Sequence, residues 1–170
     1  MLNMSEPAQE IIPELKLVFI RHAEKPIEGN NLSCQGINRS LKLPTVLFEK
    51  FGRPQRLLVP SVDLGVTTTT ARMFQTITPF AIKYNISINT KFLVEEKKKV
   101  AKYLMKRKGT VIITWEHNMI PKIVQTLGIK EDLEWPGEDY DSIWVVTFCN
   151  GKAELVKDKQ GLKPKDICRF

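Results

Sequence analysis

The sequence LKLVFIRHAEK, residues 15–25, decides how the rest of the chain is interpreted. Its apolar run, residues 17–20, ends at a charged and titratable pair, Arg21 and His22. A short run rich in β-branched and aromatic residues predicts a buried strand. Open α/β sheets bind their ligands beyond the carboxyl ends of the strands. The first strand would therefore deliver Arg21 and His22 to the usual position of a site.

A second stretch, TVIITWEH at residues 110–117, repeats this pattern. An apolar run again ends at a charged residue, Glu116, which is followed by His117. The chain holds only two histidines, and both follow a predicted strand. Two unrelated loop histidines are the alternative, but they would rarely share this position. We therefore expect His22 and His117 at the same edge of one sheet.

The remaining apolar patterns predict helices that alternate with strands. This alternation is typical of an α/β fold with a mainly parallel sheet. The Asn150-Gly151 pair is a strong turn signal and predicts that the last two strands form an antiparallel hairpin. Asn118 is expected to cap the last helix. Helices are predicted at residues 35–51, 71–83, 94–106 and 119–127, and strands at 16–20, 56–60, 86–89, 111–114, 142–149 and 152–156.

Length and hydropathy predict one soluble domain. A chain of 170 residues is typical of a single domain, expected over residues 15–170. Residues 1–14 are polar, contain two prolines and are expected to form a flexible arm. No apolar segment is long enough to cross a bilayer, and the first residues lack the pattern of a secretory signal. These features favour a cytoplasmic protein without a membrane partner, and they leave the oligomeric state open.

The net charge of +7 suits an anionic substrate, a nucleic acid or an acidic surface. No aromatic residues are interleaved with the basic ones in a nucleic-acid-binding pattern, so no nucleic acid is expected as a partner. The three cysteines argue against a disulfide framework, because their number is odd, and favour a reducing compartment. Neither carboxylates nor cysteines and histidines are spaced for metal binding, so no metal or cofactor is expected. The cysteines are Cys34, Cys149 and Cys168.

An arginine beside a histidine at a strand end suggests phosphate chemistry. The planar, permanently charged guanidinium matches phosphoryl oxygens, and histidine can serve as nucleophile, base or donor. Arg72 opens a predicted helix after the hydroxyl-rich segment 61–70, which is a favourable place for an anion. Two simpler interpretations stay open: Arg21 could pair with Glu24, and Arg72 could be a surface residue. If the two arginines and the two histidines converge, they can neutralise the charge of a phosphate without a metal.

Four segments in this order resemble the histidine phosphatase superfamily, the phosphoglycerate mutase-like group. They are RHAE, LSCQGINRS, TARMFQT and EHNMIP, and the resemblance covers residues 15–146. Three segments, CQGINR and WEH, which overlap these, and WPGEDYDSI, resemble a small bacterial phosphatase-type subgroup. The resemblance implies a three-layer α/β/α sandwich. It also implies that His22 is the nucleophile, that Arg21 and Arg72 clamp the phosphoryl oxygens, and that His117 completes the pocket.

The resemblance implies a metal-independent phosphatase that hydrolyses a phosphomonoester or a phosphohistidine through phospho-His22. Only 44 residues separate Arg72 from His117, which leaves little chain for a cover over the site. An open site favours hydrolysis over mutase chemistry and could admit a phosphorylated small molecule or a phosphoprotein. A catalytically weak module that binds a phosphorylated ligand or phosphoprotein is the main alternative. A phosphoglycerate mutase-like transferase is a further one. Lys25, Ser33 and Asn118 are expected on the substrate side of the pocket.

The proton donor for the leaving group stays open. Glu116 is favoured because a strand delivers it to the same rim as His117, although neighbouring strand residues usually face opposite ways. Glu95 and Glu96 fall in the first turn of a predicted helix, where a carboxylate is ordinarily structural. Asp139 and Asp141 are the remaining candidates.

Overall fold

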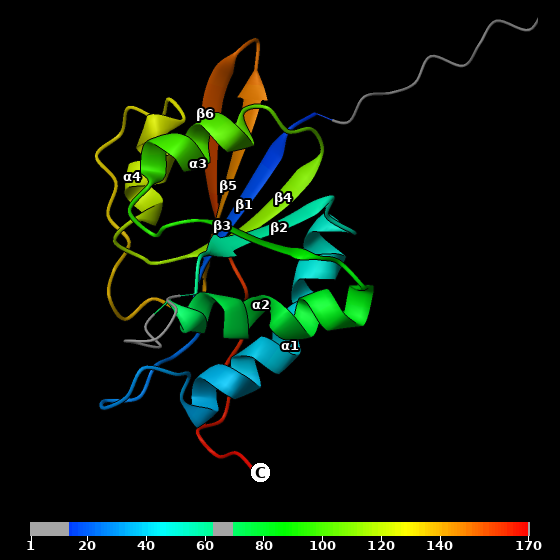
Figure 1. Cartoon of the computed structure of the whole chain (residues 1–170), viewed down its shortest axis with the longest axis vertical. Helices are drawn as coiled ribbons and strands as arrows, with labels where there is room; N and C mark the ends of the chain where they lie inside the picture. The colour runs from blue at the N-terminus through cyan, green and yellow to red at the C-terminus, as the bar shows by residue number, and fades with distance from the viewer. Residues whose placement is uncertain (1–13, 63–69, 170) are drawn as a thin grey trace, which may run out of the picture.

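The computed structural model describes residues 14–62 and 70–169. Six strands form one sheet in the order β3-β2-β4-β1-β5-β6 (Figure 1). The first four strands in chain order pair in parallel, and β5 and β6 add an antiparallel hairpin beside β1. The elements in chain order are β1 (Lys16–Arg21), α1 (Cys34–Phe51), β2 (Arg56–Pro60), α2 (Ala71–Tyr84), β3 (Ile88–Phe92), α3 (Lys97–Leu104), β4 (Thr110–Trp115), α4 (Ile120–Thr126), β5 (Ser142–Cys149) and β6 (Lys152–Lys159).

Both faces of the sheet are covered by helices. Leu17 and Phe19 of β1 face one hydrophobic cluster, which includes buried residues of α3 and α4. Val18 and Ile20 face a second cluster, which includes buried residues of α1 and α2. This alternation follows from the period of two along a strand. The predicted three-layer α/β/α sandwich, with a mainly parallel sheet and a C-terminal hairpin, is confirmed.

Some predicted boundaries are wrong. The strand expected at residues 86–89 is β3 (Ile88–Phe92), because α2 ends at Tyr84, its C-cap Asn85 is left-handed, and the next residues lead to the sheet edge. The helix expected from residue 94 begins at Lys97. Asn118 is not the cap of α4. That position belongs to Met119, because the Glu116 carbonyl accepts from the N–H groups of Met119 and Ile120 in a tight turn.

The cysteines argued against a disulfide framework, but two of them form a disulfide. Cys34, at the start of α1, is bonded to Cys168, and their Cα atoms lie 5.2 Å apart. The two residues are 134 positions apart in sequence and meet only because the C-terminal segment returns to α1 (Figure 1). Cys149 is free and exposed.

Two further predictions concern segments that are largely outside the described residues. These are the N-terminal arm at 1–14 and the hydroxyl-rich segment at 61–70. In the part of the chain that is described, no helix combines the length and the apolar character needed to cross a membrane.

Candidate active site

His22 is the first residue after β1, and the sheet holds it from the backbone. Its N–H donates to the carbonyl of Trp115, the last residue of β4, over 3.1 Å. The imidazole Nδ1 lies 2.7 Å from the carbonyl oxygen of Ala23, which can only accept. Nδ1 therefore carries the proton, and Nε2 keeps its lone pair.

The surroundings of His22 keep its ring neutral. The residue is 4% exposed, and burial lowers its pKa to about 3. The charges of Arg21 and Arg72 and the neighbouring His117 act in the same direction. These electrostatic effects indicate that the two histidines and two arginines lie in one cluster. A neutral imidazole at physiological pH is able to act as a nucleophile.

The two arginines enter the cluster from different elements and are both buried. Arg21, the last residue of β1, donates from Nη1 to the carbonyls of Gly137 and Asp139. Arg72, near the start of α2, donates from Nη2 to the carbonyl of Gly29 over 2.9 Å. The Nε atoms of both side chains are buried and have no hydrogen-bond partner among the described residues. Buried donors without a partner are costly, so these two favour an anion as the missing acceptor.

Glu116 and His117 follow β4 and reach the same cluster. Burial lowers the pKa of His117, and the charges of Arg21 and Lys25 lower it further. Burial raises the pKa of Glu116, while the charges of Arg72 and Arg21 oppose that change. Because β4 ends at Trp115, the alternation of a strand no longer fixes where Glu116 faces. The geometric objection to Glu116 as the proton donor is thereby removed.

Solved structures of three enzymes share this architecture. The protein histidine phosphatase SixA, complexed with tungstate, aligns with a TM-score of 0.66 at 17% identity, over 85% of this chain and 97% of its own. The α-ribazole phosphatase from Shigella flexneri aligns with a TM-score of 0.56 at 12% identity, over 88% of this chain and 99% of its own. A phosphoglycerate mutase from Bacillus anthracis aligns with a TM-score of 0.54 at 9% identity, over 86% of this chain and 93% of its own.

The chain has the histidine phosphatase fold. At these identities the likeness establishes the fold alone. No protein-family model matches the sequence, and no curated protein sequence matches it either.

The three residues expected on the substrate side differ in their surroundings. Lys25 is exposed at the rim of the cluster, where its charge acts on Glu116 and His117. Ser33 caps α1: its hydroxyl accepts from the Gly36 N–H and donates to the carbonyl of Glu24. Direct contact of Lys25, Ser33 and Asn118 with a substrate stays a prediction.

Three of the four carboxylates that compete with Glu116 are held by other groups. Glu96 accepts from the Leu93 N–H and from Lys99, and both contacts lower its pKa. For Asp139, burial opposes ionisation, but hydrogen bonds from Ser142 and Lys159 lower its pKa to about 2. Asp141 accepts from Arg39. Glu95 lies close enough to raise the pKa of Glu116 electrostatically.

The ion pair considered between Arg21 and Glu24 is not present, because Glu24 pairs with Arg39 over 2.8 Å. This pair, Tyr140 and Thr76 were all missed from the sequence. The Thr76 hydroxyl accepts from the N–H of Ala23 over 2.8 Å and so ties the loop after His22 to α2. The only signal for Tyr140 was its place in WPGEDYDSI, a motif that gives no partner.

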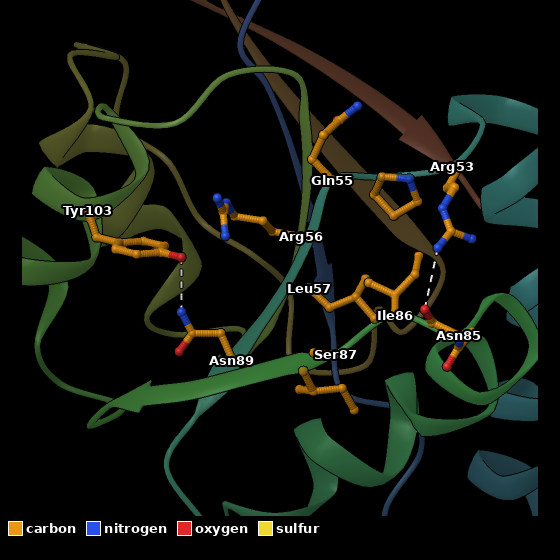
Figure 2. A pocket seen from close by; sticks show the side chains of 11 residues that line it. Arg53, Gln55, Arg56, Leu57, Asn85, Ile86, Ser87, Asn89 and Tyr103 are labelled. Atoms are coloured by element: carbon orange, nitrogen blue, oxygen red, sulfur yellow. Dashed lines mark hydrogen bonds between the residues drawn. The ribbon is translucent and has the colours of Figure 1, made fainter.

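A cavity of about 390 Å³ lies beside His117. A larger cavity, about 490 Å³, lies at the starts of β2 and β3 and includes neither histidine (Figure 2). Because these strands are parallel to β1, the larger cavity is at the opposite edge of the sheet from His22. Among the described residues, no group of three or more His, Cys, Asp or Glu is arranged to hold a metal. The smaller cavity is lined by His117, Asn118, Pro121, Lys122, Gln125, Asp132, Leu133, Glu134, Trp135 and Gly137.

Proposed function

We propose that this protein is a phosphatase that transfers a phosphoryl group from its substrate to His22 and then to water. The observation that carries the proposal is the pair of buried, unpaired Nε donors on Arg21 and Arg72, beside a neutral, buried histidine. A phosphoryl group would give both donors a charged acceptor and would place its phosphorus near the free Nε2 of His22.

The reaction divides into two transfers. Nε2 of His22 attacks phosphorus, the bond from phosphorus to the leaving group breaks, and the leaving atom takes a proton from Glu116. Water then attacks the phosphohistidine and gives a proton to Glu116, and phosphate is released with His22 neutral again. A covalent intermediate of this kind replaces one difficult step by two easier ones. Arg21 and Arg72 stabilise the charge on the equatorial oxygens in both transfers.

The pKa shifts of His22, Glu116 and His117 suit these roles. The lowered pKa of His22 leaves the nucleophile unprotonated, and the raised pKa of Glu116 keeps a proton available at higher pH than an ordinary carboxyl would. The lowered pKa of His117 favours a neutral ring, which donates one N–H to a phosphoryl oxygen.

The substrate is a phosphomonoester or a phosphohistidine whose leaving group extends into the cavity beside His117. Between Arg72 and His117, most of the chain is used by α2, β3 and α3. Little of it remains to exclude water, which favours hydrolysis over transfer within a closed site. A phosphorylated small molecule and a phosphorylated protein side chain both fit this description.

The test is turnover of an aryl phosphate in the presence of EDTA, for the wild type, His22→Ala and His117→Ala. An aryl leaving group needs little protonation, so the assay isolates the nucleophile from the acid. We expect phosphate release by the wild type, none by His22→Ala, and a phosphoenzyme with wild type and His117→Ala after a denaturing quench at alkaline pH.

Each other outcome rejects part of the proposal. Phosphate binding without turnover by the wild type would instead indicate a phosphate-binding module. Turnover by His22→Ala would exclude the proposed nucleophile. Transfer to an added alcohol in preference to water would indicate a transferase.

A further inference from the structure

The buried side chain of Arg39 donates hydrogen bonds to several groups that lie next to the site. It lies within α1, is 4% exposed, and does not belong to the cluster around His22. Its Nε and Nη2 donate to the carboxylate of Glu24 over 2.8–3.0 Å. Its Nη1 donates to Oδ1 of Asp141 over 3.0 Å and to Oε1 of Gln160 over 2.7 Å. Nη2 also lies 3.5 Å from the carbonyl of Leu162.

The first of these contacts fixes the loop that carries His22. Glu24 follows His22 by two residues, and its carbonyl accepts from the N–H and the hydroxyl of Ser33. The backbone packs against α1 so closely that a Cβ on Gly36 would lie 2.2 Å from the Glu24 carbonyl oxygen. With both its backbone and its side chain bound to α1, Glu24 leaves the loop little freedom to shift.

The second contact fixes the segment that supports Arg21. Gln160 donates from its backbone to the carbonyl of Asp141 over 2.7 Å, and from its side chain to the carbonyl of Tyr140 over 3.0 Å. The ring of Tyr140 in turn lies against the guanidinium of Arg21. Arg39 therefore holds, through Asp141 and Gln160, the segment on which Arg21 rests.

We propose that Arg39 is a positioning residue that sets the distance between the loop of His22 and the segment supporting Arg21. The inference rests on the proposed function, because alignment of these two groups matters only if they act on one phosphoryl group. A guanidinium is needed for this role, since its rigid fork reaches Glu24, Asp141 and Gln160 at once. A lysine ammonium is a single point of charge on a flexible stem and cannot reproduce that geometry.

A purely structural ion pair would have a different consequence from a positioning residue. Loss of a structural contact lowers the free energy of unfolding and leaves the folded enzyme as active as before. Loss of alignment lowers kcat in the folded enzyme, because small displacements of reacting groups are costly in rate. The two roles are separated by kinetics measured well below the unfolding temperature.

The experiment compares Arg39→Lys with two control variants in the same helix. Leu47→Ala removes a fully buried side chain from the core, and Lys50→Ala removes a surface ion pair with Asp158. For Arg39→Lys we expect kcat on an aryl phosphate to fall about 10- to 100-fold. Leu47→Ala should unfold at lower temperature with kcat unchanged, and Lys50→Ala should resemble the wild type in both.

Chemical rescue gives a second readout. Arg39→Ala leaves a space shaped for a guanidinium ion between Glu24 and Asp141. Millimolar guanidinium, far below denaturing concentrations, should raise kcat of Arg39→Ala about tenfold or more and should leave His22→Ala inactive. If Arg39→Ala does not fold, Arg39→Lys alone decides.

A kcat for Arg39→Lys within about twofold of the wild type, together with reduced stability, would overturn the inference. Turnover by the wild type reports separately on the proposed function. If the wild type shows no turnover, kcat cannot be compared. The affinity of each variant for inorganic phosphate is then compared with that of the wild type. Weaker phosphate binding by Arg39→Lys but not by Leu47→Ala would then support the positioning role, and equal binding by all variants would exclude it.

Discussion

The guanidinium of Arg21 lies over the ring of Tyr140, with Cζ 3.9 Å from the ring centroid. The same ring lies 6.1 Å from the imidazole of His22, centroid to centroid. Arg21 is therefore held on one side by an aromatic face and by the carbonyls of Gly137 and Asp139 at its Nη1. Its Nε has no partner in the described structure, and in the proposed reaction it donates to the phosphoryl group.

The Tyr140 ring is expected to contribute to anion binding through Arg21. A desolvated cation–π contact contributes about 2 kcal/mol, enough to change affinity more than tenfold. Tyr140→Leu should weaken inorganic phosphate binding about tenfold, while Tyr140→Phe keeps the aromatic face and should bind nearly as the wild type. Isothermal titration with phosphate measures both variants. Unchanged affinity in Tyr140→Leu would show that the carbonyls alone position Arg21.

Glu116 is expected to determine how the rate depends on pH and on the leaving group. As a general acid it must be protonated, so kcat/KM should fall as pH rises through its raised pKa. Glu116→Gln should lose about 100-fold or more with an alkyl phosphate and much less with an aryl phosphate. The fall of kcat/KM at alkaline pH should also be absent in Glu116→Gln. Equal losses on both substrates would assign the proton transfer to another group.

Stability at acid pH should depend on His22. Its pKa is about 3 in the folded protein, against an ordinary value of 6.5, so the unfolded chain takes up the proton first. The free energy of unfolding contributed by His22 is therefore lost as pH falls from about 6.5 towards 3. Urea unfolding of His22→Gln should show a smaller loss of stability between about pH 7 and about pH 4. A loss equal to that of the wild type would mean that His22 titrates normally.

The disulfide between Cys34 and Cys168 should contribute strongly to stability. Closing a loop of this length removes conformational entropy from the unfolded chain worth up to about 5 kcal/mol. A Cys34→Ser/Cys168→Ser variant should unfold at lower urea concentration, and dithiothreitol should shift the wild type to the same midpoint. Cys149→Ser is the control and should keep the response to dithiothreitol. No response of the wild type to the reductant would show that the bond does not form in solution.

The sequence predicted the positions of the two histidines because each position depends on a local pattern. Each follows an apolar run that forms a buried strand, and parallel strands present their carboxyl ends at one edge. The layers and the C-terminal hairpin followed from the same kind of pattern, including the Asn150-Gly151 turn.

The residues that hold the site residues in place could not be predicted from local sequence patterns. Tyr140 meets Arg21 only because the segment before β5 folds back over the end of β1, and no periodicity encodes such a path. The ion pair from Glu24 to Arg39 was misassigned for a similar reason, since Arg21 is the nearer arginine in sequence. The disulfide depends on the course of the C-terminal segment, whose sequence shows little regular pattern.

The central claim is that Arg21, Arg72, His22 and His117 converge on one tetrahedral anion. A crystal structure of the protein soaked with tungstate, a phosphate analogue, tests it most directly. We expect tungstate beside Nε2 of His22, with its oxygens accepting from the Nε atoms of Arg21 and Arg72 and from His117. Tungstate bound elsewhere while those two Nε atoms stay unpaired, or His117 turned away from the bound anion, would contradict it.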